Sequence, residues 1–245
     1  MSRKFFAQGL DQAGTPGFSH GPRWSAGIAL KRLLAPGVRA AAGEDRAQRD
    51  LFNDLPAAFP GWDPLSQAQY LEVRTLLSGY LLSSQGDRML MAHSVEGRFP
   101  FLDHDVVAFA NALPPSLKLH VLDEKHVLKR AARDLIPREI LERPKQPYRS
   151  PDAPSFIGTD APEYVDAVLT PEALASAGVF EAAPVTALVA KCREHGAGGR
   201  LSNADNMAFL GVLSTQILWH AFVRERPQPT PIDEARIGTR IVGPM

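Results

Sequence analysis

The sequence predicts a mainly α-helical protein. Apolar residues recur at the spacing of one helix face in several stretches, whereas no series of alternating apolar and polar residues predicts a sheet. The 245 residues include 19 glycines and 21 prolines, which interrupt helices frequently. We therefore expect short helices joined by loops.

Composition places the chain among ordinary globular proteins and excludes several functions. Hydrophobic residues make up 44% and charged residues 22% of the chain, and this length permits one large domain or two small ones. The 27 basic residues balance the 27 acidic residues, so the basic excess typical of nucleic-acid-binding proteins is absent. The single cysteine, Cys192, excludes an internal disulfide and a thiolate metal cluster, and we expect an inert thiol there.

We expect a cytoplasmic protein that does not span a membrane. Residues 1–10 contain no apolar stretch of the kind found in signal peptides. The longest uncharged run, residues 206–223, is marginal in length for a membrane span and contains Asn, Ser, Thr, Gln and His. A buried core helix is therefore the preferred interpretation of that run.

The chain divides into three parts by composition. Residues 1–64 are rich in proline and glycine and are interpreted as a loop-rich connecting segment, with a short helix at 26–34. Residues 65–225 carry the helical pattern. Residues 226–245 begin with three prolines in a polar context, which predicts a disordered tail.

Helical spacing predicts the elements of the middle part. A first amphipathic helix is expected to end at Gly86-Asp87, where Asp87 caps a second helix over 88–95. That second helix is apolar on most sides, so we expect it to be deeply buried. Ser202 and Asp205 form a capping-box pattern that opens the last long helix, to about residue 223. Other helices are predicted at residues 106–112, 127–135, 139–141, 163–169, 171–177 and 183–191.

Familiar catalytic and metal-binding motifs are absent from the sequence. It contains no phosphate-binding G-x-x-x-x-G-K-[ST] loop, no G-x-G-x-x-G, no H-E-x-x-H and no C-x-x-C. The 7 histidines show no metal-ligand spacing. We therefore predict no metal site within this chain.

Residues 86–103 place charged side chains around an otherwise apolar stretch. Burying charge is costly unless the groups are paired or bind a ligand. Two interpretations stay open from spacing alone: a salt-bridge lattice, in which Asp87 or Asp103 pairs with Arg98, or a functional site. The charged residues of this stretch are Asp87, Arg88, Glu96, Arg98 and Asp103.

A second unusual stretch is the basic loop at residues 142–149. Arg143, Lys145 and Arg149 lie between prolines that stiffen the backbone. Such a loop can present cations to phosphate groups, or it can be a simple exposed basic loop. Spacing alone leaves both interpretations open.

Together the two stretches resemble the synthetase domain of glutamine-hydrolysing asparagine synthetases and, more distantly, of β-lactam synthetases. Order and spacing match over about residues 66–150, and a looser similarity runs over residues 5–223. The matching residues are Tyr80-Leu81-Leu82, Asp87-Arg88-Met89, Met91-Ala92-His93-Ser94-Val95-Glu96, Arg98, Pro100-Phe101-Leu102-Asp103 and Arg143-Pro144-Lys145-Gln146.

The resemblance implies a fold and a reaction. The chain would be the C-terminal helical portion of an adenine-nucleotide α-hydrolase-like (ATP pyrophosphatase) α/β synthetase domain, without its parallel sheet. Members of the family are carbon–nitrogen ligases that convert aspartate to asparagine through an aspartyl-adenylate. They use ATP with Mg²⁺, whose ligands we do not expect in this chain, and ammonia released from glutamine.

The resemblance also assigns roles to residues. Glu96 matches the active-site carboxylate, which is suited to take a proton from the attacking amine. Lys145 matches the active-site lysine, which neutralises charge on the phosphates and the tetrahedral intermediate. His93 and Ser94 match positions that line the ATP site. The residues expected to support the site are Asp87, Arg88, Arg98 and Asp103.

Two parts of the family's machinery do not occur in these residues: the S-G-G-x-D-S pyrophosphate loop and the glutaminase domain. We expect a separate chain to carry both, and this chain to be inactive alone. Without the sheet, the apolar helix at 88–95 would be partly uncovered, which predicts self-association. Two alternatives stay open: a non-catalytic interaction module or truncated remnant, and an amide ligase acting on another carboxylate.

Overall fold

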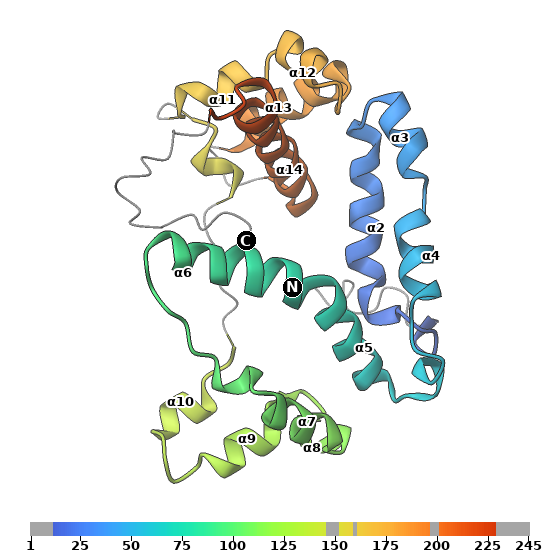
Figure 1. Cartoon of the computed structure of the whole chain (residues 1–245), viewed down its shortest axis with the longest axis vertical. Helices are drawn as coiled ribbons and strands as arrows, with labels where there is room; N and C mark the ends of the chain where they lie inside the picture. The colour runs from blue at the N-terminus through green and yellow to red at the C-terminus, as the bar shows by residue number, and fades with distance from the viewer. Residues whose placement is uncertain (1–11, 146–151, 159–160, 197–200, 229–245) are drawn as a thin grey trace, which may run out of the picture. The chain divides into compact units, whose positions relative to one another are not determined.

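The computed structural model describes residues 12–145, 152–158, 161–196 and 201–228 (Figure 1). The described chain is mainly helical, as predicted, and forms two compact units. The first unit combines the residues up to 29 with residues 44–149, and the second combines residues 30–43 with those from 150 onward. The parallel sheet of an adenine-nucleotide α-hydrolase fold does not occur in the described part of the chain.

The first unit contains short helices and one small hairpin. Its strands, β1 and β2, pair antiparallel over two residues each and were not predicted, because such short strands leave no period in the sequence. The elements are η2 (Phe18–His20), α2 (Gly21–Leu30), α4 (Arg46–Asn53), η4 (Phe59–Gly61), α5 (Pro64–Glu72), η5 (Val73–Asp87), α6 (Arg88–Ala92), η6 (Pro100–Leu102), α7 (His104–Ala112), α8 (Pro115–Lys118), β1 (Leu119–His120), β2 (Asp123–Glu124), α9 (His126–Ala131) and α10 (Arg138–Glu142).

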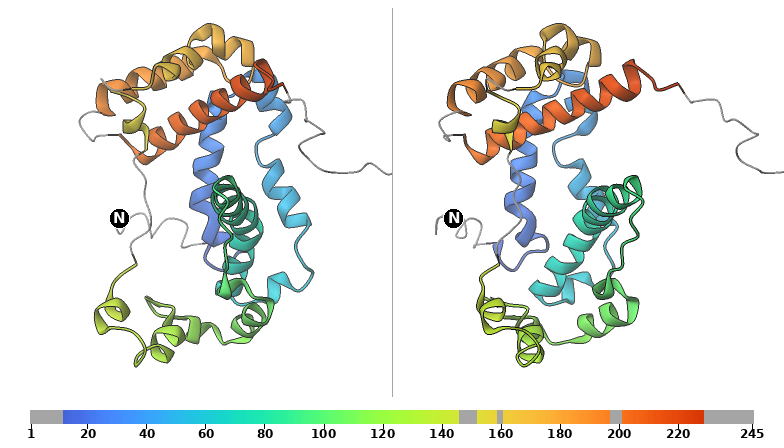
Figure 2. Two further views of the ribbon diagram at one scale, coloured as in Figure 1. Left: turned by 60° about the vertical axis from the view of Figure 1, so that its left-hand side comes forward. Right: turned by 90° about the vertical axis from the view of Figure 1, so that its left-hand side faces the viewer.

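The second unit is a bundle in which α14 lies alongside α11, α12 and α13 (Figure 2). Predicted helices at 163–169, 171–177 and 183–191 match α11, α12 and α13, the last of which is longer. The elements are η3 (Lys31–Leu33), α3 (Pro36–Ala42), η7 (Ala153–Ser155), α11 (Glu163–Val168), α12 (Pro171–Ala177), α13 (Ala182–Gly196), α14 (Asn203–Trp219) and η8 (His220–Arg224).

The three parts predicted from composition differ from the two compact units of the structure. Helices α2 to α4 fill much of the segment that we interpreted as loop-rich. The division into residues 1–64, 65–225 and 226–245 stays a prediction. Most of the expected disordered tail, residues 229–245, lies outside the described residues.

One helix runs without a break from Pro64 to Ala92 through α5, the π-helical segment η5 and α6. The predicted end at Gly86-Asp87 is wrong, because Asp87 has helical dihedral angles and its side chain caps nothing. A glycine inside a helix costs only about 1 kcal/mol, which neighbouring turns can offset. The helix ends at Ala92 rather than at residue 95.

The predicted deep burial of residues 88–95 is also wrong. Met89 is 53% and Met91 75% exposed. Among the described residues of the first unit, the buried apolar side chains are Phe59 and Leu71. Apolar pattern alone misled the prediction, since burial requires a partner surface as well as apolar side chains.

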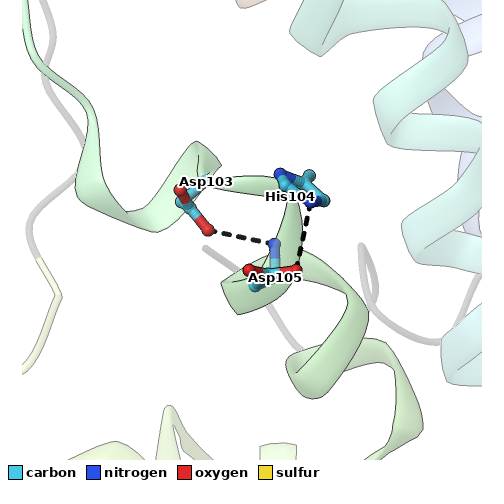
Figure 3. A group of neighbouring side chains, drawn as sticks. All are labelled: Asp103, His104 and Asp105. Atoms are coloured by element: carbon cyan, nitrogen blue, oxygen red, sulfur yellow. Dashed lines mark hydrogen bonds and ion pairs between the residues drawn. The ribbon is translucent and has the colours of Figure 1, made fainter.

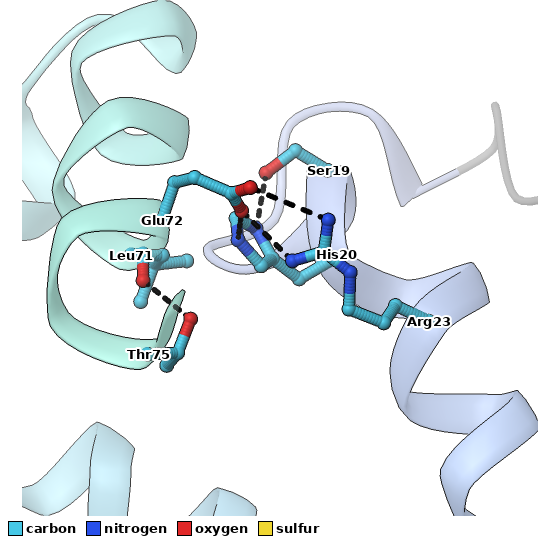
Figure 4. A network of polar contacts seen from close by, with 6 residues as sticks. All are labelled: Ser19, His20, Arg23, Leu71, Glu72 and Thr75. Carbon is cyan, nitrogen blue, oxygen red and sulfur yellow. Dashed lines mark hydrogen bonds and ion pairs between the residues drawn. The ribbon is translucent and has the colours of Figure 1, made fainter. Parts of the chain in front are cut away.

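A polar network around Glu72 joins η2 and the start of α2 to the end of α5 (Figure 4). The buried His20 donates from Nε2 to the Glu72 carboxylate at 2.9 Å, and Arg23 donates to it at 2.8 Å. The Ser19 hydroxyl lies 2.9 Å from the other ring nitrogen of His20. Partial burial opposes ionisation of Glu72, but the bonds from Arg23 and His20 outweigh it and lower its pKa.

The second unit holds the apolar core. Phe209, Val212 and Leu213 of α14 are buried against side chains from the other helices of the bundle. Helix α14 continues into η8, and the span Asn203–Arg224 is long and apolar enough to cross a membrane by length and composition. Its buried face supports the predicted core helix instead. Cys192 is completely buried in the same core, and this burial raises the pKa of its thiol.

The predicted capping box at the start of α14 is confirmed. The Ser202 hydroxyl accepts from the Asp205 N–H at 3.1 Å and donates to the Asp205 carboxylate at 2.6 Å. Lys191 of α13 lies 2.8 Å from the same carboxylate. The bonds from Lys191 and Ser202 lower the pKa of the buried Asp205. The Ser202 hydroxyl therefore caps α14, and the Asp205 carboxylate holds that hydroxyl and ties α14 to α13.

We predict that Asp205→Asn lowers the free energy of unfolding of the second unit by about 1–3 kcal/mol at neutral pH, because a buried charged hydrogen bond is lost. A carboxylate with a lowered folded-state pKa stabilises above its unfolded pKa of about 4, and this contribution disappears as pH falls through the folded value. The difference in free energy of unfolding between the wild type and Asp205→Asn should therefore disappear in acid. Urea titrations read by hydrogen exchange of α13 and α14 measure this.

Asp166→Asn is the matched control, since Asp166 forms an exposed ion pair with Arg193. Its stability should change by less than about 1 kcal/mol. Equal losses in the two variants would contradict the assigned role of Asp205.

We also predict that the chain self-associates through the exposed apolar side chains of the first unit. Sedimentation velocity should show species heavier than one chain, and Met91→Lys should shift the distribution toward monomer. Met207→Lys is the control, because Met207 is also an exposed methionine but lies on α14 of the second unit. A monomeric wild-type chain at high concentration would count against this prediction.

Candidate functional site

The loop that carries Glu96 starts at a Schellman motif at the end of α6. The N–H of Val95 donates to the Leu90 carbonyl at 2.9 Å, and the N–H of Ser94 donates to the Met91 carbonyl at 3.2 Å. The backbone of Ser94 adopts the left-handed conformation, with φ of 56°. Glycine is the usual residue at this position because a side chain is strained there.

The side chains of Leu90 and Phe99 lie close against Gly97, just beyond Glu96. A Cβ atom on Gly97 would lie 2.6 Å from Leu90 Cδ1 and 2.8 Å from Phe99 Cζ, so only glycine fits without movement. Leu90 thus contacts both flanks of Glu96, through its carbonyl before that residue and through its side chain after it. The backbone of Glu96 is held in place although its side chain is exposed.

Glu96 forms an ion pair with Arg98. The predicted pairing of Arg98 with Asp87 or Asp103 is therefore wrong, because residues two apart on an extended loop reach each other directly. Both side chains of the pair are highly exposed, at 75% for Glu96 and 76% for Arg98. Because its side chain is exposed, the Glu96 carboxylate is accessible to a ligand. Exposed ion pairs contribute little to stability, so a ligand can displace Arg98 at small cost.

The neighbouring predicted residues are also exposed. His93 caps the end of α6 through its backbone, and the Ser94 side chain points to solvent. Asp87 and Arg88 lie one helical turn earlier and have no ion-pair partner among the described residues. The structure thus brings His93, Ser94 and Glu96 onto one short loop, and the supporting roles of Asp87 and Arg88 stay predictions.

Asp103 acts as the N-cap of α7 (Figure 3). Its carboxylate accepts from the N–H groups of Asp105 at 3.0 Å and Val106 at 3.4 Å. His104 lies 3.1 Å from the Asp105 carboxylate, and both side chains are almost fully exposed. This group offers three potential metal ligands, but the cap already occupies one carboxylate and the others face solvent.

Lys145 lines a cavity of about 420 Å³ next to α9 and α10. Its walls are largely apolar. Four cationic side chains and one carboxylate, that of Glu124, also line it. Of the predicted site residues, Lys145 alone lines it, so the described structure does not bring Glu96 and Lys145 into one cavity. The rest of the predicted basic loop, residues 146–149, lies outside the described residues. The lining residues are Glu124, Lys125, Leu128, Lys129, Ala132, Ile136, Ile140, Leu141, Arg143, Pro144 and Lys145.

The sequence analysis missed Lys125 and Lys129, which share this cavity. Lys125 caps α9 with a left-handed φ of 59°, and the two lysines are four residues apart, a spacing that places them on one helix face. This four-residue spacing is the feature of the sequence that could have indicated them. Asp123 binds Lys129 at 2.5 Å and His126 at 2.7 Å, and these two bonds lower the pKa of Asp123.

Known proteins that resemble this chain in sequence identify its family. Residues 12–221 match the sequence profile of the asparagine synthase family. A putative glutamine-hydrolysing asparagine synthetase of Mycobacterium tuberculosis is 30% identical over 211 residues, which cover 85% of this chain and 30% of that protein. Human glutamine-hydrolysing asparagine synthetase is 42% identical over 67 residues, 26% of this chain and 12% of the human one.

A glutamine-hydrolysing asparagine synthetase of Bacillus subtilis is 31% identical over 103 residues, 42% of this chain and 16% of that protein. No solved structure matches the chain significantly. The chain spans less than a third of the length of the mycobacterial relative. Because the family profile matches most of its length, the chain belongs to the asparagine synthase family.

Proposed function

We propose that this chain supplies the helical part of the active site of an ATP-dependent asparagine synthetase. The observation that carries the proposal is the loop after α6, where Leu90 contacts the chain on both sides of Glu96 and the Glu96 carboxylate is exposed. Preorganised backbone and an accessible functional group are what a catalytic carboxylate requires. Membership in the family supports aspartate as the acceptor.

Glu96 acts as the general base in this proposal. It takes a proton from ammonia as the nitrogen attacks the acyl carbon of an aspartyl-adenylate, and AMP leaves. Arg98 holds the carboxylate before substrate arrives, and the pair is weak enough to open because both groups are exposed. Arg98 is therefore a positioning residue.

Ser94 supports the same assignment through its backbone strain. A non-glycine residue in the left-handed region costs about 1–2 kcal/mol, and strain of this kind collects at functional sites. The Ser94 side chain is exposed, and we propose that it and His93 contact the nucleotide. A glycine would form the same helix end without strain but would have no hydroxyl.

Lys145 and its cavity fit the phosphates of ATP. Lys125, Arg143 and Lys145 have no ion-pair partner among the described residues, so their charge is available to an anion. The acidic group at the start of α7 does not fit Mg²⁺, since the cap occupies Asp103 and histidine is a poor ligand for that ion. Mg²⁺ ligands would come from another part of the enzyme.

The remaining machinery would come from residues beyond these 245. The pyrophosphate loop and an ammonia source are the parts that the proposal requires, on a separate chain or a longer one. The exposed apolar side chains of the first unit support such an arrangement, because a nucleotide-binding portion would cover them. A cytoplasmic location is part of this proposal.

We predict that Glu96→Gln lowers amide formation by about 10²- to 10⁴-fold, because the general base is lost. The assay combines this chain with a polypeptide that carries the pyrophosphate loop and glutaminase portion of a family member, and measures asparagine. The chain alone should form none. Glu163→Gln, at an exposed glutamate that starts α11, is the control. An unchanged rate in a folded Glu96→Gln protein would remove the proposed role.

We predict that Ser94→Gly raises stability while lowering activity. Relief of the left-handed strain should add about 0.5–1 kcal/mol to the free energy of unfolding, and loss of the hydroxyl should raise the KM for ATP in the reconstituted assay. Ser25→Gly, in the interior of α2, should instead destabilise by about 0.5–1 kcal/mol. A more stable Ser94→Gly protein with unchanged ATP kinetics would show that Ser94 is structural only.

A further inference from the structure

A second concave surface, next to the cavity of Lys145, is lined by residues of α9, of α10 and of the turn between them. It encloses about 830 Å³ and shares Lys129 and Leu141 with that cavity as common walls. None of the residues that resemble the asparagine synthetase motifs lines it. The lining residues are Asp123, His126, Lys129, Arg130, Arg133, Arg138, Leu141 and Glu142.

The two carboxylates of this surface are already occupied. Asp123 accepts from Lys129 at 2.5 Å and from His126 at 2.7 Å. Glu142 accepts from the Arg138 side chain at 2.6 Å. Asp123 therefore neutralises Lys129, and Glu142 neutralises Arg138. Among the described residues, neither carboxylate forms an ion pair with Arg130 or Arg133.

Arg130 and Arg133 are therefore the uncompensated charges. Arg130 lies in the last turn of α9 and Arg133 in the turn that follows, where the Arg133 N–H donates to the Arg130 carbonyl at 3.4 Å. Both residues line the same concavity. Four lysine and arginine side chains line this surface together with two carboxylates, in a chain whose net charge is zero. The surface has a local excess of positive charge directed at an open space.

We propose that Arg130 and Arg133 bind a small polyphosphate anion at this surface. A guanidinium binds phosphate oxygens through two parallel N–H donors, and two guanidiniums suit an anion with several oxygens and more than one charge. A simple carboxylate is satisfied by one guanidinium. This site goes beyond the proposed function, because it lies outside the cavity of Lys145 and needs no turnover.

The test uses inorganic pyrophosphate and isothermal titration at about 0.1 M salt, where distant charges are screened. A Lys145→Ala chain provides the background, so that anion binding in the neighbouring cavity is removed. In that background, Arg130→Gln with Arg133→Gln should weaken pyrophosphate binding at least about tenfold, a change of about 1.4 kcal/mol. Exposed arginines tolerate such changes, and circular dichroism checks the fold.

A matched pair of arginines controls for the loss of charge. Arg46 and Arg49 are also three residues apart and lie on α4, but Arg46 pairs with Asp50 and Arg49 with Asp45. Changing both to Gln should leave pyrophosphate binding unchanged. Equal weakening by the two double variants would overturn the proposal as non-specific charge. Loss of all binding in Lys145→Ala alone, or no binding by the wild type, would overturn it too.

Discussion

The hydrogen bond from the Val95 N–H to the Leu90 carbonyl ends α6 and sets the geometry of the candidate site. It stops a helix that otherwise runs on from Pro64, and it forces Ser94 into the left-handed region. The contact of Gly97 with the Leu90 side chain then fixes where the chain emerges. Glu96 is placed between these two constraints, so the position of its backbone follows from the contacts that Leu90 makes on either side and not from its own ion pair.

The two units are stabilised by different physical means. The second unit buries a continuous set of apolar side chains, for which area removed from water is the dominant favourable contribution. The described part of the first unit depends more on local devices: helix caps, the Glu72 network and the aromatic contacts of Phe59, Trp62 and Tyr70. The residues that resemble the synthetase motifs lie in the less buried unit, as expected for a surface that meets substrate or another part of an enzyme.

Local features were predictable from the sequence, and features that depend on distant residues were not. The capping box of Ser202 and Asp205 needs four consecutive residues and was predicted correctly. The burial of residues 88–95 depends on what packs against them, so its prediction failed. The partner of Arg98 depends on the course of the loop after α6, and the cavity of Lys145 on the fold of residues 124–145. The roles of Glu96 and Lys145 came from family resemblance and stay predictions.

Burial of Cys192 gives the second unit a chemical reporter. Its sulfur lies in the core shared by α13 and the other helices, where burial suppresses the reactive thiolate. Since the sequence has one cysteine, any alkylation of the native chain marks an opening of this core. The labelling rate therefore measures how often the second unit opens, independently of the first.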